Sequence, residues 1–231
     1  MVYGFCFYSG RSGRMKFGAV VAAAGMSTRM QDFKQLMTLG GVSLVGRIVR
    51  TFQHAGVEKI VVVTGYRSQE VEEALKGRNV VFLRNERYAE TEMFDSAKIG
   101  LAGLKDQCEH VFFNPVDVPL FTGTTVRKEI QLAGSADVLV PCCRGKAGHP
   151  LLLSAEAVRH LLVCEGGGGL KEAYEKLAAE GCARVRHIQV EDPGILWDTD
   201  TQEDYQKLQK LYWEMQEYQD DPAKREMDMC K

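Results

Sequence analysis

Apolar and polar residues alternate along this chain in blocks that predict strands and helices in turn. Continuous apolar runs closed by a turn residue are typical of buried strands, and we expect strands at 18–24, 59–65, 79–85, 110–119, 136–142, 149–154 and 183–190. Segments with helical spacing lie between them, at 68–77, 95–104, 122–133, 155–163, 169–180 and 201–215. One more helix is predicted where Val42, Val45, Val49 and Phe52 share a face, and Gly56 is expected to end it.

This alternation predicts the fold class. Strands that alternate with helices of about ten residues form α/β domains, so we expect a mostly parallel, twisted sheet with helices on both faces. Ligands bind such sheets beyond the carboxyl ends of the strands. The residues that directly follow the predicted strands are therefore the candidates for function.

The length suits one domain, since 231 residues can bury a sizeable core. Met15 lies just before the first predicted strand, so we expect residues 1–14 to be an N-terminal extension and 15–215 to be the domain. Residues 216–231 are polar and charged, and they are expected to form a fraying tail.

Composition narrows the class of partner. A formal net charge of -2 gives no general attraction to nucleic acid or to an anionic membrane. No apolar run approaches the roughly 18–20 residues that span a bilayer. The seven cysteines are scattered without a CxxC pair, which favours reduced thiols and a cytoplasmic location.

The loop after the first predicted strand combines features of an anion site. Residues 18–34 read GAVVAAAGMSTRMQDFK, so Gly25, Ser27 and Thr28 offer backbone N–H groups and hydroxyls, and Arg29 and Lys34 add two cations. Such a loop suits a phosphate chain. The alternative is an ordinary strand–turn–helix corner with two solvated charges. The stretch matches neither GxxxxGK[ST] nor GxGxxG, which argues against a P-loop enzyme or an NAD enzyme.

Three aspartates follow later strands. Asp117 ends an apolar strand before a Val-Pro turn, where its carboxylate could bind Mg²⁺ together with substrate phosphates or simply stabilise the turn. Asp198 and Asp200 precede the final helix, where they could bind metal or cap the helix. Because side chains alternate along an extended segment, we expect only one of these two to face the cleft.

Two glycine-containing loops complete the candidates. In RGKAGHPLLL (144–153), Gly148 and His149 lead into a strand, and the histidine could contact a substrate or brace the loop. In EGGGGLKEA (165–173), a glycine run precedes a helix and could bind an anion or merely connect. No Ser/His/Asp set and no HExxH motif is apparent.

These segments together resemble the nucleotidyltransferases that build dinucleotide forms of the molybdenum cofactor, within the MobA-like nucleoside triphosphate transferases. AAAGMSTRMQDFK (22–34) is similar to their LAAGxSxRMGxxK motif, and the match continues with QLMTLGGVSLV (35–45). Asp117-Val118-Pro119 resembles their DxP motif, GHPLLL (148–153) their GHP segment, and DTDTQED (198–204) their DIDTPED. The resemblance spans roughly residues 17–210.

The resemblance implies a Rossmann-like fold of the nucleotide-diphospho-sugar-transferase type and a Mg²⁺-dependent nucleotidyl transfer. The terminal phosphate of a molybdopterin-type cofactor would attack the α-phosphorus of a nucleoside triphosphate, and pyrophosphate would leave. By resemblance, Ala23, Ala24, Gly25 and Ser27 would hold the nucleotide, Arg29 and Lys34 would neutralise the triphosphate, and Gly148 and His149 would contact the acceptor. Asp117 and one of Asp198 and Asp200 would hold Mg²⁺.

The same resemblance favours CTP over GTP, because the cytidylyl-transferring members have AAG where this chain has residues 23–25, and they carry GHP. It also implies a molybdenum hydroxylase apoprotein as recipient of the product. The chain departs from the family pattern at Gln31, at EMFDS (92–96), at GGGGLK (166–171) and at Gln202.

Two alternatives remain open from the sequence. The chain could transfer a nucleotide to another acceptor, such as a sugar phosphate or methylerythritol phosphate, and an acceptor screen distinguishes this case. It could instead be a non-catalytic accessory protein that binds nucleotide or cofactor for a molybdenum hydroxylase. Nucleotide binding without turnover would support that second alternative.

Overall fold

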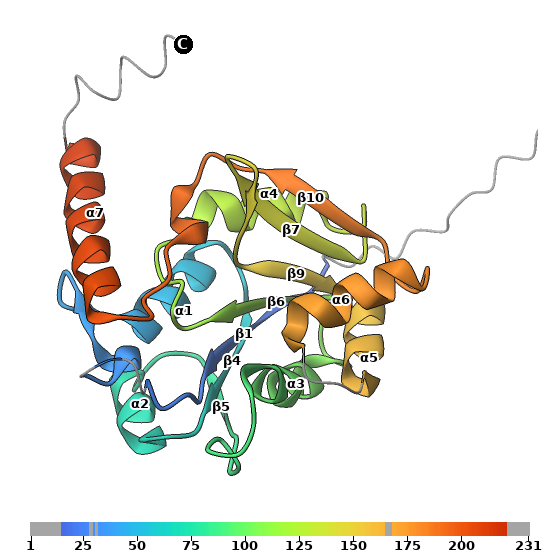
Figure 1. Ribbon diagram of the computed structural model, residues 1–231, viewed down its shortest axis with the longest axis horizontal. Helices are drawn as coiled ribbons and strands as arrows, with labels where there is room; N and C mark the ends of the chain where they lie inside the picture. Colours follow the sequence, from blue (N-terminus) through green and yellow to red (C-terminus); the bar gives the residue numbers. More distant parts are fainter. Residues whose placement is uncertain (1–14, 28–29, 31, 165–167, 221–231) are drawn as a thin grey trace, which may run out of the picture.

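A computed structural model describes residues 15–27, 30, 32–164 and 168–220. Its main feature is an 8-stranded sheet (Figure 1). The strands of this sheet are β1 (Phe17–Ala23), β4 (Lys59–Thr64), β5 (Val81–Arg84), β6 (His110–Pro115), β7 (Val138–Cys143), β8 (Lys146–Ala147), β9 (Leu151–Ser154) and β10 (Val185–Gln189). Their order is β10-β7-β9-β6-β1-β4-β5, with β8 paired to β7.

The sheet is mixed but mostly parallel, as the alternation of strands and helices predicted. β1 lies between β4 and β6 and is parallel to both. β9 runs antiparallel between β6 and β7, and β8 is antiparallel to β7. The chain leaves β1 toward β4 and β5 and later returns to β6 on the other side, so the carboxyl ends of β1 and β6 form a switch point where ligands bind.

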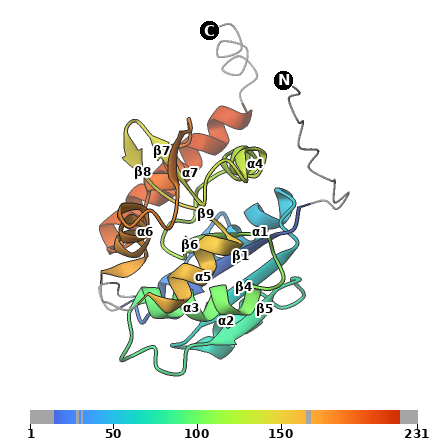
Figure 2. The ribbon, with the colours of Figure 1, turned by 90° about the vertical axis from the view of Figure 1, so that its right-hand side faces the viewer.

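Helices cover both faces (Figure 2). They are α1 (Leu44–His54), α2 (Ser68–Ala74), α3 (Met93–Leu104), α4 (Gly123–Leu132), α5 (Ala155–Val163), α6 (Gly169–Ala179) and α7 (Gln202–Asp220), with short 3₁₀ helices η1 (Lys34–Leu36) and η2 (Pro193–Leu196). Side chains of β1 alternate between two cores: Val20 and Ala22 pack with α3, α5 and α6, whereas Ala19 and Val21 pack with α1, α2 and α4.

The first helix begins later than the apolar spacing predicted, so placing Val42 on it was wrong. Val42 lies in β3 (Val42–Ser43), which pairs with β2 (Thr38–Leu39) in a small hairpin. The side chain of Ser43 accepts a hydrogen bond from the Gly46 N–H and caps the helix, which therefore starts at Leu44. The hairpin turn uses Gly40 and Gly41, both with positive φ.

Three other helix boundaries differ from the predictions by two or more residues, and one of them is the end of α2 at Ala74 instead of Gly77. Helix α3 begins at Met93 rather than at Asp95, because Glu92 and Asp95 form a reciprocal capping box. Helix α7 continues to Asp220, beyond the expected end at Met215. Its last residues, QEYQD, contain no helix breaker before Pro222.

Helix α7 stands at one edge of the molecule and is anchored by a third small core (Figure 1). Tyr205 and Leu208 of α7 pack against Leu39 and Leu44, and the Tyr205 hydroxyl donates to the carbonyl oxygen of Thr38 at 2.6 Å. This packing fixes the start of α7, and with it the preceding aspartates. In the part of the chain that the structure describes, no helix has the length and apolar character needed to cross a membrane.

One buried carboxyl group lies outside the candidate site. Glu129 of α4 is fully buried, and neither of its carboxylate oxygens has a hydrogen-bond partner among the described residues. Burial raises its pKa well above the usual value. The folded protein therefore holds a proton on Glu129 at a pH where the unfolded chain has lost it.

We expect Glu129→Met to raise the free energy of unfolding by about 1–3 kcal/mol near pH 8 and by less near pH 5. Between the unfolded and folded pKa values of Glu129 the folded state binds the extra proton, so this one group lowers the stability of the wild-type protein by about 1.4 kcal/mol per pH unit as the pH rises. Urea unfolding at pH 5 and pH 8 measures both effects, with Glu58→Met on the surface as the charge-matched control. A Glu129→Met stability that follows the wild type at both pH values would contradict this account.

Candidate functional site

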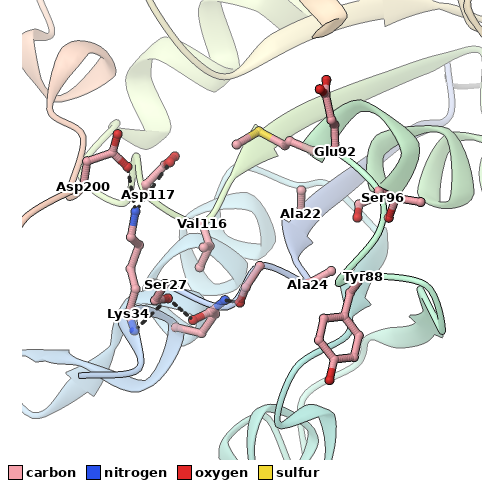
Figure 3. Close-up of a pocket in the computed structure, with 14 residues that line it drawn as sticks. Ala22, Ala24, Ser27, Lys34, Tyr88, Glu92, Ser96, Val116, Asp117 and Asp200 are labelled. Carbon is pink, nitrogen blue, oxygen red and sulfur yellow. Dashed lines mark hydrogen bonds and ion pairs between the residues drawn. The ribbon is translucent and has the colours of Figure 1, made fainter. Parts of the chain in front are cut away.

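A cavity of about 220 Å³ opens at the carboxyl ends of β1 and β6 (Figure 3). Residues from four parts of the chain line it: Ala22, Ala24, Gly25 and Ser27; Lys34 and Gln35; Tyr88, Thr91, Glu92, Met93 and Ser96; and Val116, Asp117 and Asp200. Lys34, Asp117 and Asp200 lie on one side of it, and Tyr88, Glu92 and Ser96 on the other. The cavity therefore sits where the switch-point rule places a ligand.

The loop after β1 is held by a buried amide that the sequence analysis did not identify. Gln35 is 1% exposed, and its Nε2 donates to the carbonyl oxygens of Ala23 (3.2 Å) and Gly25 (2.8 Å). Its Oε1 accepts from the Ser27 hydroxyl at 3.1 Å. Ser27 has φ 55° and in turn accepts from the Lys34 N–H at 3.3 Å. The loop conformation is therefore determined by side-chain bonds from its own downstream segment.

Several backbone N–H groups of this loop remain available to a ligand. Among the described residues, no hydrogen bond involves the N–H of Gly25, Met26 or Ser27. Successive free N–H groups in a tight loop form a concave site for anions. Ser27 contributes its N–H rather than its hydroxyl proton, because that proton is already donated to Gln35.

Lys34 lies at the start of η1 with its ammonium group between two carboxylates. Nζ is 2.9 Å from Oδ1 of Asp200 and 3.7 Å from Oδ2 of Asp117. Lys34 as a whole is only 8% exposed. A lysine this buried keeps its charge only when it is paired, so these two contacts explain how the cavity accommodates it.

Asp117 is positioned by the turn after β6. The fully buried Asn114 donates from Nδ2 to the carbonyl oxygens of Pro115 (2.6 Å) and Val118 (3.0 Å), which closes the turn around Asp117. The Thr199 hydroxyl donates to the carbonyl oxygen of Asp117 at 3.1 Å. This last bond joins the segment before α7 to the turn and brings the predicted aspartates together.

The site carries more negative than positive charge among its described residues. Burial raises the pKa of Asp117, the Lys34 ammonium lowers it, and the charges of Asp200 and Asp198 raise it further. One ammonium group thus contacts two carboxylates, Asp117 and Asp200, and the charge of Asp198 acts from outside the cavity. An added cation would relieve this imbalance.

The two aspartates before α7 occupy different positions. Asp200 lines the cavity and pairs with Lys34, whereas Asp198 is exposed and does not line the cavity. Our reason for separating them was wrong, because residues two apart in an extended segment lie on the same side. Thr199 between them is fully buried on the other side. Asp198 still acts on the site through its charge.

The donor set fits a divalent cation that is completed by a substrate. No group of three or more His, Cys, Asp or Glu side chains within the described ranges could hold a metal ion by itself. Mg²⁺ commonly takes one or two carboxylates and fills its other positions with phosphate oxygens and water. Asp117 and Asp200, two carboxylates that line one cavity, match that number of protein ligands.

The GHP segment lies in a second cavity of about 280 Å³, which shares Glu92 and Met93 with the first. Its lining is mainly apolar, with Phe94, Phe113, Val140, Ala147, Leu151, Leu170 and Tyr174, and it also includes Gly148, His149 and Lys171. A Cβ on Gly148 would clash with the carbonyl oxygen of Ile195, so only glycine fits there. The two cavities are neighbours along one wall.

His149 is neutral at physiological pH. Burial lowers its pKa to about 4. Its ring meets Phe113 edge to face, with 6.0 Å between the ring centroids, and a cis peptide bond joins it to Pro150. Its Nδ1 is buried and has no hydrogen-bond partner within the described part of the chain. An unpartnered ring nitrogen beside a mainly apolar cavity is a candidate contact for a ligand.

Some predicted features lie outside the described residues. These are the expected extension at 1–14, Thr28 and Arg29 of the opening motif, Gln31, residues 165–167 of the glycine run, and residues 221–231 of the expected tail. Of the predicted nucleotide residues, Ala24, Gly25, Ser27 and Lys34 line the first cavity, whereas Ala23 contributes only its carbonyl oxygen to the Gln35 contact.

Sequence reasoning missed Gln35 and the wall formed by Tyr88, Thr91 and Ser96. Gln35 carried no local signal, because its three bonds go to residues 8 to 12 positions earlier in the chain. Asn85 organises the wall by donating from Nδ2 to the Thr91 hydroxyl (2.8 Å) and the Ser96 hydroxyl (3.0 Å). No local sequence pattern predicts these hydrogen bonds of Asn85.

A loop with unbonded N–H groups after β1 and a turn that carries Asp117 after β6 thus line one cavity at the carboxyl ends of the strands, where α/β proteins bind ligands. Among solved structures, this chain is similar to a nucleotidyl transferase from Methanothermobacter thermautotroptrophicus (Mth528), with 26% identity and a TM-score of 0.78 over 88% of this chain and 100% of that one. The chain belongs to the MobA-like NTP transferase family, whose domain model matches residues 19–182.

Two further matches are partial, one in fold and one in sequence. The fold is shared with Rv0371C from Mycobacterium tuberculosis H37Rv, solved as a complex with manganese, at 23% identity and a TM-score of 0.67 over 86% of this chain and 100% of that one. The bifunctional protein GlmU of Carboxydothermus hydrogenoformans is 30% identical over 126 residues, which cover 52% of this chain and 27% of GlmU. The chain thus spans about a quarter of the length of that relative.

Proposed function

We propose that this protein transfers CMP from CTP to the terminal phosphate of a molybdopterin-type cofactor and releases pyrophosphate. The observation that carries the proposal is the joining of an anion loop, Lys34 and the Asp117–Asp200 pair around one cavity, directly beside a second, mainly apolar cavity. The first cavity would take the triphosphate and the second the acceptor.

The triphosphate half rests on charge and backbone geometry. The free N–H groups of Gly25, Met26 and Ser27 would donate to phosphate oxygens. Lys34 would exchange part of its pairing with Asp117 and Asp200 for the triphosphate, and Arg29 of the motif would add a second cation. These groups neutralise the charge that builds up on the leaving pyrophosphate.

Mg²⁺ would be held by Asp117 and Asp200 together with phosphate oxygens. When bound, it supplies charge neutralisation and alignment of the reacting phosphates. The excess negative charge at these aspartates supports this assignment, and the manganese complex of Rv0371C is consistent with it. Asp198 would strengthen the attraction from outside the cavity.

The reaction requires no general base on the protein. An oxygen of the acceptor phosphate forms a bond to the α-phosphorus, and the bond from the α-phosphorus to the bridging oxygen breaks with its electron pair going to pyrophosphate. A phosphate monoester has its second pKa near 6, so it already carries the attacking negative charge at neutral pH. The protein contributes positioning and charge stabilisation.

The acceptor half rests on the composition of the second cavity. Phe94, Phe113 and Leu170 offer apolar surface for a ring system, and His149 offers one neutral, unpartnered nitrogen. A planar pterin would pack its ring faces on this apolar surface, and this fit supports the molybdopterin-type acceptor.

We expect His149→Phe to raise the KM for the acceptor by at least about 10-fold while it changes the KM for the triphosphate less than about 2-fold. The phenyl ring keeps the apolar contact with Phe113 but removes the nitrogen, and one buried hydrogen bond to a ligand is worth about this much. Steady-state kinetics with each substrate varied measure the two KM values, with His54→Phe as the control. Equal changes in both KM values would remove His149 from the acceptor site.

The choice of CTP rests on the Ala-Ala-Gly sequence at 23–25 and on the GHP segment.

We also propose that the protein is cytoplasmic, because its described cysteines are free thiols: Cys108, Cys142, Cys143, Cys164 and Cys182. A molybdenum hydroxylase apoprotein is the recipient that fits the product.

An acceptor screen tests the proposed function. Purified protein is given CTP and Mg²⁺ with the molybdopterin-type cofactor, with sugar 1-phosphates or with methylerythritol phosphate, and the products are weighed by mass spectrometry. We expect a gain of one CMP on the cofactor alone. Transfer to a sugar phosphate instead would keep the reaction and replace the acceptor, and the absence of transfer despite CTP binding would favour the accessory protein.

A further inference from the structure

Gln35 has no role in the chemistry described above, although its buried amide lines the cavity and is fully engaged with one loop. Its amide makes three hydrogen bonds to the loop after β1: two from Nε2, to the carbonyl oxygens of Ala23 and Gly25, and one to Oε1, from the Ser27 hydroxyl. It is buried and still lines the triphosphate cavity. A buried amide that spends nearly all of its bonding capacity on one loop determines the conformation of that loop.

The two bonds from Nε2 have a direct consequence for anion binding. In a trans peptide the carbonyl of one residue and the N–H of the next point in opposite directions. Holding the carbonyl oxygens of Ala23 and Gly25 toward Gln35 therefore turns the N–H groups of Ala24 and Met26 away from it. Like the N–H of Met26, that of Ala24 has no hydrogen-bond partner among the described residues. The same bonds satisfy two partial negative charges that would otherwise repel a triphosphate.

The third bond links the loop to the catalytic lysine. The Lys34 N–H donates to the Ser27 hydroxyl, which donates to Gln35. Ser27 has a positive φ, a conformation that a serine adopts at some cost and that these bonds offset. The backbone of Lys34 is thus fixed relative to the N–H groups, while its Nζ reaches Asp200 and Asp117.

We propose that Gln35 is the positioning residue of the phosphate site: it orients the loop N–H groups toward the β- and γ-phosphates and shields the phosphates from the carbonyl oxygens of Ala23 and Gly25. This inference rests on the proposed function, because it assumes that a triphosphate binds this cavity. It assigns to Gln35 a share of triphosphate affinity without any contact to the acceptor.

The test uses inorganic pyrophosphate with Mg²⁺ as the probe, since it requires neither the correct base nor the correct acceptor. We expect Gln35→Met, which keeps the length of the side chain and loses its hydrogen bonds, to weaken pyrophosphate binding by about 10- to 100-fold in calorimetry. Gln107→Met is the control. Gln107 also donates to a carbonyl oxygen, that of Gly103, but it is exposed and does not line the cavity. Its affinity should equal that of the wild type.

A second measurement on the wild-type protein makes the test independent of how the variant folds. In ¹⁵N-resolved spectra, pyrophosphate should shift the amide protons of Ala24 and Met26 downfield, as expected for N–H groups that begin to donate to an anion. If Gln35 had a purely structural role, Gln35→Met would have a lower melting temperature, but pyrophosphate would not shift these two amide protons in the wild-type protein.

The outcomes separate the inference from the proposed function. If the wild type binds pyrophosphate and Gln35→Met binds it equally well, or if the two amides do not shift, the role of Gln35 is wrong and the proposed function stands. If the wild type binds neither pyrophosphate nor any nucleoside triphosphate, the proposed function itself fails.

Discussion

Asp117→Asn is expected to lower turnover at least about 100-fold while the protein remains folded. Asparagine has nearly the same shape but no charge, so it cannot replace a carboxylate that binds Mg²⁺ beside the triphosphate. The turn should survive, because it is held by Asn114 and by the Thr199 contact to the Asp117 carbonyl oxygen, neither of which uses the carboxylate. Initial rates of pyrophosphate release at saturating substrates measure the effect.

Asp106→Asn is the matched control for this prediction, because Asp106 is exposed in the turn after α3. It should keep the wild-type rate. Circular dichroism and the melting temperature will test whether Asp117→Asn keeps the fold. We expect that it does, because burial raises the pKa of Asp117, so loss of its charge should not destabilise the protein strongly. Near-normal turnover of Asp117→Asn would remove this residue from the metal site.

Lys34→Met is expected to weaken triphosphate affinity and turnover by about 1.5–3 kcal/mol, which corresponds to roughly 10- to 150-fold. Methionine keeps the buried stem and removes the ammonium group that pairs with Asp200 and Asp117. The triphosphate then meets carboxylates that no lysine compensates. Kinetics with the triphosphate varied measure the loss.

The exposed Lys105 provides the control variant Lys105→Met, which should leave both kinetic constants unchanged. Raising the Mg²⁺ concentration should recover part of the Lys34→Met activity, because the metal can offset some of the missing charge. Unchanged kinetics in Lys34→Met would return Lys34 to the role of a structural ion pair.

The strands and most helices could be predicted because they carry strong local signals. Long apolar runs marked β1, β4 and β6, and the rule that ligands bind beyond strand ends pointed to the loop at 24–34 and to Asp117. The spacing of apolar residues could not distinguish Val42 in a hairpin from Val42 in a helix, because two residues of a short strand also fit a helical face. The antiparallel direction of β9 depends on pairing between distant strands and leaves no mark in its own sequence.

In the candidate site, too, some residues could be predicted from the sequence and others could not. Lys34, Asp117 and Asp200 follow strands or precede a helix, so position alone suggested them. Gln35 and Asn85 act through bonds to residues that the fold brings near, and nothing in their neighbours along the chain reveals those bonds. Asp198 could be separated from Asp200 only by the packing of Thr199 and the contact of Asp200 with Lys34.

The central claim is that this cavity transfers a nucleotide to a molybdopterin-type cofactor. The most direct test measures Mg²⁺-dependent release of pyrophosphate by the purified protein. The cofactor is present, and CTP, GTP, ATP or UTP is supplied in turn. We predict release with CTP, dependence on both Mg²⁺ and the cofactor, and little release with the other three triphosphates. Absence of release with every triphosphate would contradict the assignment of this cavity to nucleotidyl transfer onto that cofactor.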